Sequence, residues 1–455
     1  MPERKRWNLF SEMNVESLLD LVKRGIRTKG FVYVTVGNLV NAALGGLFYL
    51  LCARILSVTS YGYISYYLAL GFFVGSVSIL GLSTTVTTFY PKEARDSLVR
   101  EATLLTFLVG LATGFVASLY VFFFPAPAGS SAVSGFQVSL QWLVGGVDFV
   151  FMLPLTLGIV FYYMTLAVAL GRRRYRRFAV IVSVVRVVQL GLVAFFYLFS
   201  AFSGYFLGDL EKLMLVAYVS PFFLVSLDYF RSLFSVDRAS FRFAEVRAKL
   251  TFTLHTWGMS LAQASRTVLD KIIVGLFFGL LFLGTYNLAF QFLLVFLIVP
   301  QSLFSYLLPE KAGGSVRREV EIIGLVAAVV ITVFGIFLAP YLIRWLFPHF
   351  TDSIPATQVI SLAVVPASVA NIRASVLLSE ERTKIVLVGY VSALAVDVLG
   401  ILLLGSSFQA VGFAAAFMLS QVVLAIILVV LPSERFANLI NRRKSAVRTE
   451  RTNHG

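Results

Sequence analysis

The feature that most constrains this chain is a series of long apolar runs separated by short basic segments. A helix of about 20 apolar residues crosses the roughly 30 Å hydrocarbon core of a bilayer. Backbone groups in lipid must satisfy their own hydrogen bonds, so such runs favour helices. We therefore predict an all-α integral membrane protein with about twelve transmembrane helices. The expected spans lie near residues 31–53, 63–90, 101–124, 142–170, 178–200, 212–233, 253–278, 280–308, 320–342, 356–378, 385–404 and 410–431.

The placement of basic residues predicts the orientation of these spans. With the amino terminus in the cytoplasm, 31 of the 38 Lys and Arg residues fall in cytoplasmic segments. Only Arg54, Lys212 and Arg344 fall in the opposite loops. One helix more or fewer would reverse this bias over the rest of the chain. We therefore expect a multi-pass plasma-membrane protein with both termini in the cytoplasm.

The net charge of +15 has the same explanation. Basic runs such as 172–177 lie at predicted membrane edges, where they anchor orientation and contact anionic lipid. A nucleic-acid partner is not expected, because no soluble module carries these charges. In segment 1–30, the spacing of Val15, Leu18, Leu19 and Val22 is consistent with a short interfacial helix or a solvated tail.

Nothing in the sequence indicates an enzyme. The longest predicted outside connection is 125–141, too short for a folded catalytic domain. The three histidines, His255, His349 and His454, are scattered, and no phosphate-binding loop, dinucleotide fingerprint or hydrolase motif occurs. The single Cys52 excludes a disulfide framework. No cofactor is expected, although proton or sodium coupling is left open.

The two halves of the chain echo one another, as in many transporters. Segment Phe89-Tyr90-Pro91-Lys92-Glu93-Ala94 matches Leu307-Leu308-Pro309-Glu310-Lys311-Ala312, and Tyr61-Gly62-Tyr63 matches Leu283-Gly284-Thr285. Both halves start from the same side, so the repeat is parallel. The expected organisation is a cytoplasmic segment 1–30, a six-helix bundle 31–234, a linker 235–252, a second bundle 253–431 and a basic tail 432–455.

Polar residues inside the spans indicate where a cavity lies, because a charge at the bilayer centre costs about 2.5–3.5 kcal/mol. At 100° per residue, one stripe of the seventh span holds Ser260, Gln263, Arg266, Thr267 and Asp270, with Lys271 at its edge. The equivalent first span carries Asn38, Asn41, Gly45, Tyr49 and Cys52. Both halves thus turn a polar face inward from their first helix, as a central cavity requires.

Three further polar pairs are weaker candidates for this cavity. They are Arg186 with Gln189, Asp397 with Tyr390, and Gln291 with Asn287. Structural alternatives stay open for several of the candidate residues. Arg266 and Asp270 are also spaced for a neutral i,i+4 ion pair. Lys271 could snorkel to the interface, and Gln291 could form a hydrogen bond between helices.

Buried basic residues suit an anionic ligand such as a diphosphate, since arginine offers paired donors in a low-dielectric setting. Arg266, Lys271 and Arg186 are the candidates for that role, and Asn38, Asn41 and Gln263 for hydrogen bonds to a sugar. Asp270 and Asp397 would either cancel this positive field or serve as coupling sites for protons or sodium.

The sequence also resembles the oligosaccharide flippase, or polysaccharide export, branch of the multidrug/oligosaccharidyl-lipid/polysaccharide exporter superfamily. The resemblance covers nearly the whole chain. Its residues run from Ala53-Arg54-Ile55-Leu56-Ser57 through Tyr61-Gly62-Tyr63 and Gly81-Leu82 to Pro91-Lys92-Glu93. The second half repeats the pattern with Leu269-Asp270-Lys271-Ile272-Ile273-Val274-Gly275 and Leu283-Gly284-Thr285-Tyr286-Asn287-Leu288-Ala289.

This resemblance implies two six-helix bundles in a V, alternating access, and a polyprenyl-diphosphate-linked sugar as substrate. Relatives that export the peptidoglycan precursor carry arginines in the first helix, where this chain has only Arg54 at the outer end, which argues against that cargo. In drug-exporting relatives, carboxylates in the amino-terminal half bind coupling cations, and spans one to three are taken to hold none here.

The leading hypothesis is therefore a flippase for a lipid-linked oligosaccharide, with membrane lipids as surroundings and glycosyltransferases or a polymerase of the same pathway as candidate partners. Two alternatives stay open. One is a cation-coupled exporter of drugs or metabolites with the same fold, and the other is a membrane-embedded sugar transferase or scaffold.

Overall fold

A computed structural model describes residues 29–123, 142–203, 210–234, 242–298, 318–379 and 382–432. Within these ranges the chain is helical apart from short turns and contains no strand. The possible interfacial helix near residue 18, the outside connection 125–141 and most of the basic tail lie outside the described residues. The all-α fold predicted from the sequence is confirmed.

Within the described residues, the amino-terminal half contains eight helical segments. They are α2 (Lys29–Ile55), α3 (Val58–Ile79), α4 (Leu82–Glu93), α5 (Asp96–Phe123), α6 (Trp142–Gly171), α7 (Tyr175–Ser203), α8 (Leu210–Val225) and α9 (Leu227–Phe234). The apolar core of this half is rich in aromatic rings, with Phe48, Tyr66 and Phe222 fully or almost fully buried.

The carboxy-terminal half begins with a short linker helix. Its segments are α10 (Ala244–Ala248), α11 (Leu250–Phe277), α12 (Leu280–Phe296), α14 (Arg318–Phe337), α15 (Ala339–Leu346), the 3₁₀ turn η2 (Pro348–Phe350), α16 (Ser353–Ser361), α17 (Val364–Ser379) and α18 (Thr383–Val430). The expected linker 235–252 therefore ends in helical structure, and α11 forms the seventh span without interruption.

Among the described residues, seven helices are long and apolar enough to cross a membrane. An eighth span results if α14 and α15, which meet at 46°, are counted together. The single segment α18 contains a non-helical residue, Gln409 (φ 50°, ψ −130°), and turns back there, so it supplies the eleventh and twelfth passes. With such breaks taken into account, the helices follow the order of the twelve predicted passes.

The second pass is broken where the sequence predicted one continuous helix over 63–90. Leu80 and Gly81 both have positive φ, which separates α3 from α4. The start of α11 packs directly on this break, because a Cβ on Gly81 would lie 2.6 Å from the carbonyl oxygen of Thr253. The Oγ1 atoms of Thr85 and Thr253 lie 2.9 Å apart at the same crossing.

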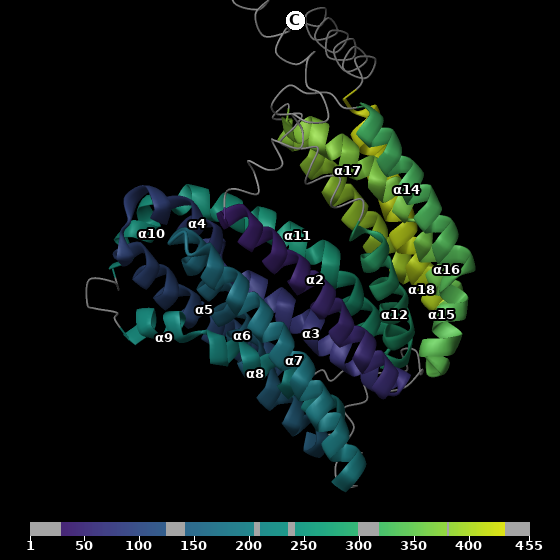
Figure 1. The fold of residues 1–455 in the computed structure, drawn as a ribbon, viewed down its shortest axis with the longest axis horizontal. Coiled ribbons are helices and arrows are strands. Elements are labelled where there is room, and N and C mark those ends of the chain that lie inside the picture. The colour runs from purple at the N-terminus through teal and green to yellow at the C-terminus, as the bar shows by residue number, and fades with distance from the viewer. Residues whose placement is uncertain are drawn as a thin grey trace, which may run out of the picture.

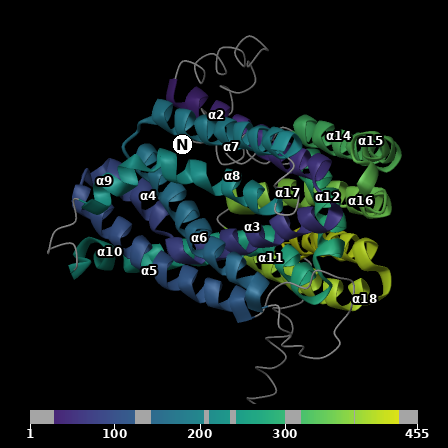
Figure 2. The same cartoon turned by 90° about the horizontal axis from the view of Figure 1, so that it is seen from below.

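The two halves form a V (Figure 1). They converge where α2 ends and α12 begins, near α15 and α16, and diverge toward the end where α2 begins. We call these the convergent end and the basic end. Helix α3 packs along α11 and α12, which makes it the main contact between the halves. Figure 2 shows the same three helices in the middle of the molecule.

Candidate functional site

A cavity of about 490 Å³ lies on the seam between the halves. Five of its residues come from one face of α3, at positions i, i+4, i+7, i+11 and i+14. The amino-terminal half contributes Tyr49, Ser65, Ala69, Phe72, Ser76, Ile79, Gly81, Ser83 and Tyr163. The carboxy-terminal half contributes Ser260, Ala264, Thr267, Val268, Lys271, Asn287, Phe290, Gln291 and Leu294. Both halves therefore present small and polar side chains to the seam.

Lys271 is the charged residue among the described lining residues, and it is buried with only 7% exposed. Its Nζ donates to the carbonyl oxygen of Thr267 at 2.8 Å and lies 3.3 Å from the carboxylate of Asp270. The same ammonium sits 3.4 Å from the ring centroid of Phe290, a cation–π contact. Lys271 is thus held at the seam and does not snorkel to the interface.

Two buried carboxylates accompany this lysine. Asp270 accepts a hydrogen bond of 2.8 Å from the hydroxyl of Tyr286 on α12. Asp397 on α18 is 5% exposed, and its charge acts on both Lys271 and Tyr286. Helices α11, α12 and α18 therefore bring Asp270, Lys271 and Asp397 into one cluster. With both carboxylates ionised, these three side chains carry a net charge of −1, so Asp270 and Asp397 offset the positive field of Lys271.

Gln291 also reaches the cavity, as a member of a polar row on α12. Its amide nitrogen lies 3.5 Å from the side-chain oxygen of Asn287. Asn287 in turn donates to the hydroxyl of Ser65 on α3 at 2.7 Å. This hydrogen bond joins the two halves across the seam.

A second cluster lies within the amino-terminal half around Arg186 on α7. Its Nε donates to Asn41 on α2 at 2.8 Å, and its Nη1 donates to Gln189 at 2.8 Å. Gln189 is fully buried and donates to the backbone oxygen of Tyr218. The guanidinium also lies 5.8 Å from the ring centroid of Tyr218. Asn41 on α2, Arg186 and Gln189 on α7, and Tyr218 on α8 therefore form one polar cluster.

Arg186 has no ion pair with any carboxylate among the residues that the structure describes. Gly45 on α2 faces the guanidinium, since a Cβ there would lie 3.4 Å from its carbon, an ordinary van der Waals contact. Tyr49 and Tyr163, which line the seam cavity, both lie within electrostatic range of Arg186. Arg186, which pairs with no carboxylate in the described part of the chain, therefore lies close to two residues that line the cavity.

The remaining predicted residues fall in different places. Asn38 is exposed and is not among the residues that line the cavity. The side chains of Gln263 and Arg266 lie outside the described part of α11, so their placement stays a prediction. The structure also adds Ser65, Ser76 and Ser83, which sequence reasoning missed. The regular spacing of small residues along α3 was the signal that could have found them.

The expectation that spans one to three hold no carboxylate is wrong, because Glu101 begins the third predicted span. Glu101 is buried, and its Oε2 accepts the backbone N–H groups of Glu245 and the next residue at 2.9 and 3.0 Å. It is thereby engaged in holding the linker helix α10 against α5. Within the described residues, no three His, Cys, Asp or Glu side chains cluster as metal ligands.

The convergent end is closed by direct backbone contact between the halves. A Cβ on Gly62 would lie 1.9 Å from the carbonyl oxygen of Leu280, and a Cβ on Gly284 would lie 2.0 Å from that of Val58. These two glycines are the matched positions of the internal repeat. Beside them, Arg54 donates to the backbone oxygen of Leu346 at 2.9 Å. Only glycine permits this crossing of α3 and α12.

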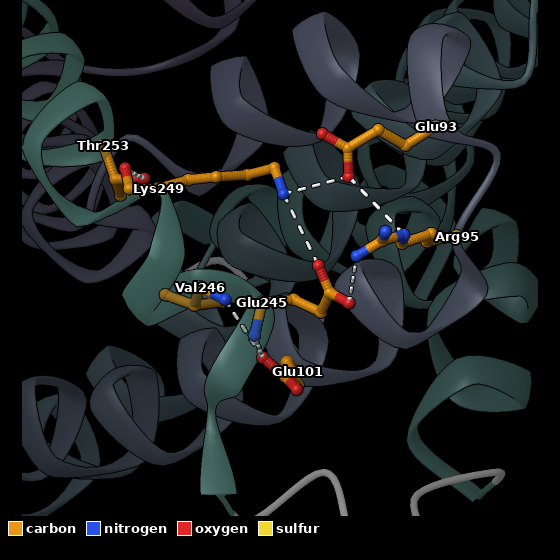
Figure 3. A network of polar contacts seen from close by, with 7 residues as sticks. All are labelled: Glu93, Arg95, Glu101, Glu245, Val246, Lys249 and Thr253. Atoms are coloured by element: carbon orange, nitrogen blue, oxygen red, sulfur yellow. Dashed lines mark hydrogen bonds and ion pairs between the residues drawn. The ribbon is translucent and has the colours of Figure 1, made fainter.

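At the basic end, an ion-pair network joins the amino-terminal half to the linker (Figure 3). Lys249 lies 3.0 Å from Glu93 and 3.4 Å from Glu245, and Arg95 lies 2.8 Å from Glu245. Partial burial alone would raise the pKa of Glu245. The hydrogen bond from Arg95 and the charges of Arg95 and Lys249 outweigh that effect, so the pKa lies below its ordinary value.

Two helical halves with a cavity on their seam define an all-helical, multi-pass membrane protein. Among solved structures, the chain is similar to the lipid II flippase MurJ in an inward closed conformation, with TM-score 0.66, 12% identity, and 88% of this chain and 87% of that chain covered. It is also similar to an inward-facing multidrug resistance MATE transporter of the MOP superfamily, with TM-score 0.59, 13% identity, and coverage of 90% and 99%. It is similar as well to a MATE structure in a bent conformation, with TM-score 0.56, 14% identity, and 92% of this chain and 97% of that chain covered.

No protein-family model and no curated protein matches the sequence. At identities this low, the structural neighbours establish the fold and not the substrate. The chain therefore has the fold of the MOP transporters and flippases, as the sequence predicted. The assignment to the oligosaccharide branch stays a prediction.

Proposed function

We infer that this protein is a flippase that moves a polyprenyl-diphosphate-linked oligosaccharide across the plasma membrane by alternating access. The observation that carries this proposal is the position of Arg186 near Tyr49 and Tyr163, which line the seam cavity. Its guanidinium is partly buried and has no carboxylate partner among the described residues. A diphosphate supplies the negative charge and acceptor oxygens that such a group favours. The MurJ neighbour, named as a lipid II flippase, supports the same class of cargo.

In this mechanism the headgroup occupies the seam cavity while the lipid tail stays in the bilayer. Ser65, Ser76 and Asn287 supply hydrogen-bonding groups for the sugar. Lys271 is already paired with Asp270, so its attraction for a diphosphate is weaker than the sequence suggested. Arg186 is therefore the principal candidate, and Arg266 stays a candidate whose side chain lies outside the described residues. Transport then requires the convergent end to open and the halves to close at the basic end.

The test is a flipping assay with the purified protein in liposomes and a short-chain polyprenyl-diphosphate-linked sugar. Arg186→Gln keeps a polar side chain but removes the charge and the guanidinium fork, and the loss of a charged hydrogen bond worth about 1.5–3 kcal/mol predicts roughly a tenfold to hundredfold lower rate. The matched control is Arg344→Gln, since Arg344 is exposed at the other end of the molecule. Equal rates in both variants would remove Arg186 from the site.

A cation-coupled exporter of drugs or metabolites is the second candidate. The observation in its favour is the buried cluster of Asp270 and Asp397, whose net negative charge suits a coupling proton or sodium ion. Efflux of small cations that depends on a proton or sodium gradient, and that Asp397→Asn abolishes, would support this function. The flippase proposal predicts no such efflux.

A further inference from the structure

A second cavity, of about 350 Å³, lies at the basic end of the amino-terminal half, away from the seam. It is bounded by the start of α5, the connection from α6 to α7, and α9. Its polar lining consists of Asp96, Arg100, Arg172, Arg174, Arg231 and Ser232. The volume is at the lower end of the range of about 300–1,000 Å³ for small-molecule pockets.

Positive charge dominates this pocket. Four guanidinium groups face one carboxylate among the described lining residues. The carboxylate is already engaged, because Asp96 Oδ1 accepts hydrogen bonds from Arg172 at 2.9 Å and from the Tyr90 hydroxyl at 3.0 Å. The Nε of Arg172 is buried and has no acceptor among the residues that the structure describes. The pocket is therefore lined by four guanidinium groups, and at least one of their donors is unused.

Guanidinium groups gathered in one pocket attract an anion. Phosphate is the anion that several guanidinium groups bind best, since each can direct paired N–H donors at its oxygens. The arrangement is thus suited to a phosphate group with contacts from three separate chain segments.

The surroundings of the pocket indicate where the phosphate comes from. Helix α9 carries Arg231 and Ser232 on its pocket side, while Leu227 and Phe234 at its ends are 57% and 85% exposed. Exposed apolar residues beside a basic pocket are typical of a helix at the membrane interface. Anionic lipid headgroups lie at that depth.

We propose that the pocket formed by Arg100, Arg172, Arg174 and Arg231 binds the phosphate of an anionic phospholipid headgroup at the basic end of the molecule. The lipid occupies a site separate from the seam cavity and links α5, α9 and the α6–α7 connection. Its acyl chains extend along the exposed apolar residues of α9.

The experiment measures lipid binding to the full-length protein by native mass spectrometry. Phosphatidylglycerol is titrated against phosphatidylcholine, and inorganic phosphate is tested separately. The pocket variant is Arg174→Gln with Arg231→Gln, which leaves the Arg172–Asp96 pair intact. The control is Arg173→Gln with Arg176→Gln, which removes two charges from the same basic run at exposed residues outside the pocket.

Wild type and control are expected to retain phosphatidylglycerol in preference to phosphatidylcholine. The pocket variant is expected to lose about tenfold or more in apparent affinity, from the loss of charged hydrogen bonds. If the thermal unfolding midpoint of the pocket variant in neutral lipid equals that of the control, the pocket variant is folded. Saturable phosphate binding that only the pocket variant loses, without lipid preference, would keep the site and make free phosphate its ligand. Equal losses in both double variants, or no loss in either, would overturn the proposal.

Discussion

Asn41 is the residue on which the Arg186 cluster depends most directly, because it supplies an acceptor from a second helix. Replacing Asn41 with Ala leaves the Nε–H of Arg186 without that acceptor. A fully buried donor without a partner costs about 1–3 kcal/mol; this contact is part-buried, so the thermal midpoint in detergent is expected to fall by an amount that corresponds to the lower part of that range. Asn38→Ala is the control, since Asn38 is exposed on the same helix and its loss should cost less than about 0.5 kcal/mol. Equal destabilisation by both would contradict the role of Asn41.

Glu245 makes the contact at the basic end dependent on pH. Its pKa is lowered in the folded protein, so the stabilisation is complete above the ordinary glutamate pKa of about 4.3 and is lost as the pH falls through the folded value. Arg95 is largely exposed, which limits the contribution to about 0.2–1 kcal/mol. Wild type should exceed Glu245→Gln in stability at pH 6, and the difference should shrink as the pH falls below about 4.3 and through the lower pKa of the folded protein. A constant difference across this range would contradict the assignment.

Some of the site was predictable residue by residue, and some was not. Arg186 and Gln189 are three residues apart on one helix, so their contact follows from helix geometry. The contact of Arg186 with Asn41 joins α7 to α2 and depends on how those helices pack. Lys271 shows the same limit, because its buried ion pair with Asp270 and its contact with Phe290 require α12. Local patterns identified the polar residues, whereas tertiary packing determines which of the charged ones are paired with an opposite charge.

At the scale of elements, the crossing of α3 and α12 depends on Gly62. Gly62→Ala would place a methyl group against the carbonyl oxygen of Leu280, and overpacking of this kind typically costs about 1–3 kcal/mol. We expect the convergent end to open. The buried Cys52 is a natural reporter, because it lies near Tyr61 in the closed core and is the one cysteine of the chain.

The measurement is labelling of Cys52 by a water-soluble maleimide. Gly62→Ala should raise the labelling rate about fivefold or more, as a shift of 1 kcal/mol or above implies. Gly46→Ala is the control, since no atom lies within 4 Å of a Cβ at that position. Labelling that stays slow in both variants would show that the crossing tolerates the methyl group.

Helix existence was predicted well from the apolar runs, but not every helix break was. The sequence placed a boundary near 404–410, and the chain turns back there at Gln409, the non-helical residue inside α18. It predicted no break near Gly81, where the start of α11 packs on the chain. The length of an apolar run is set by the thickness of the bilayer and can be read from the sequence. The break at Gly81 depends on packing against another helix, which the sequence alone does not give. Paired glycines such as Gly62 and Gly284 were visible as a repeat, but their contact emerges only from the packed halves.

At the scale of the whole molecule, the V arrangement makes one strong prediction about transport. The halves are closed at the convergent end, where the rings of Tyr61 and Phe350 lie with centroids 5.4 Å apart. If the cargo leaves through that end, joining the halves there must stop transport. A short bis-maleimide between Cys residues placed at these two positions, in a Cys52→Ser background, should reduce flipping at least tenfold.

The two single-cysteine variants, treated with the same reagent, are the matched controls, because they carry the label without the link. They should keep the flipping rate of the untreated protein. Cross-linked protein that transports as fast as these controls would mean that the convergent end does not open during the cycle. The cargo would then have to pass along the lipid-facing side of the seam between α2 and α12. The cross-link therefore separates alternating access from a fixed lateral path on the same scaffold.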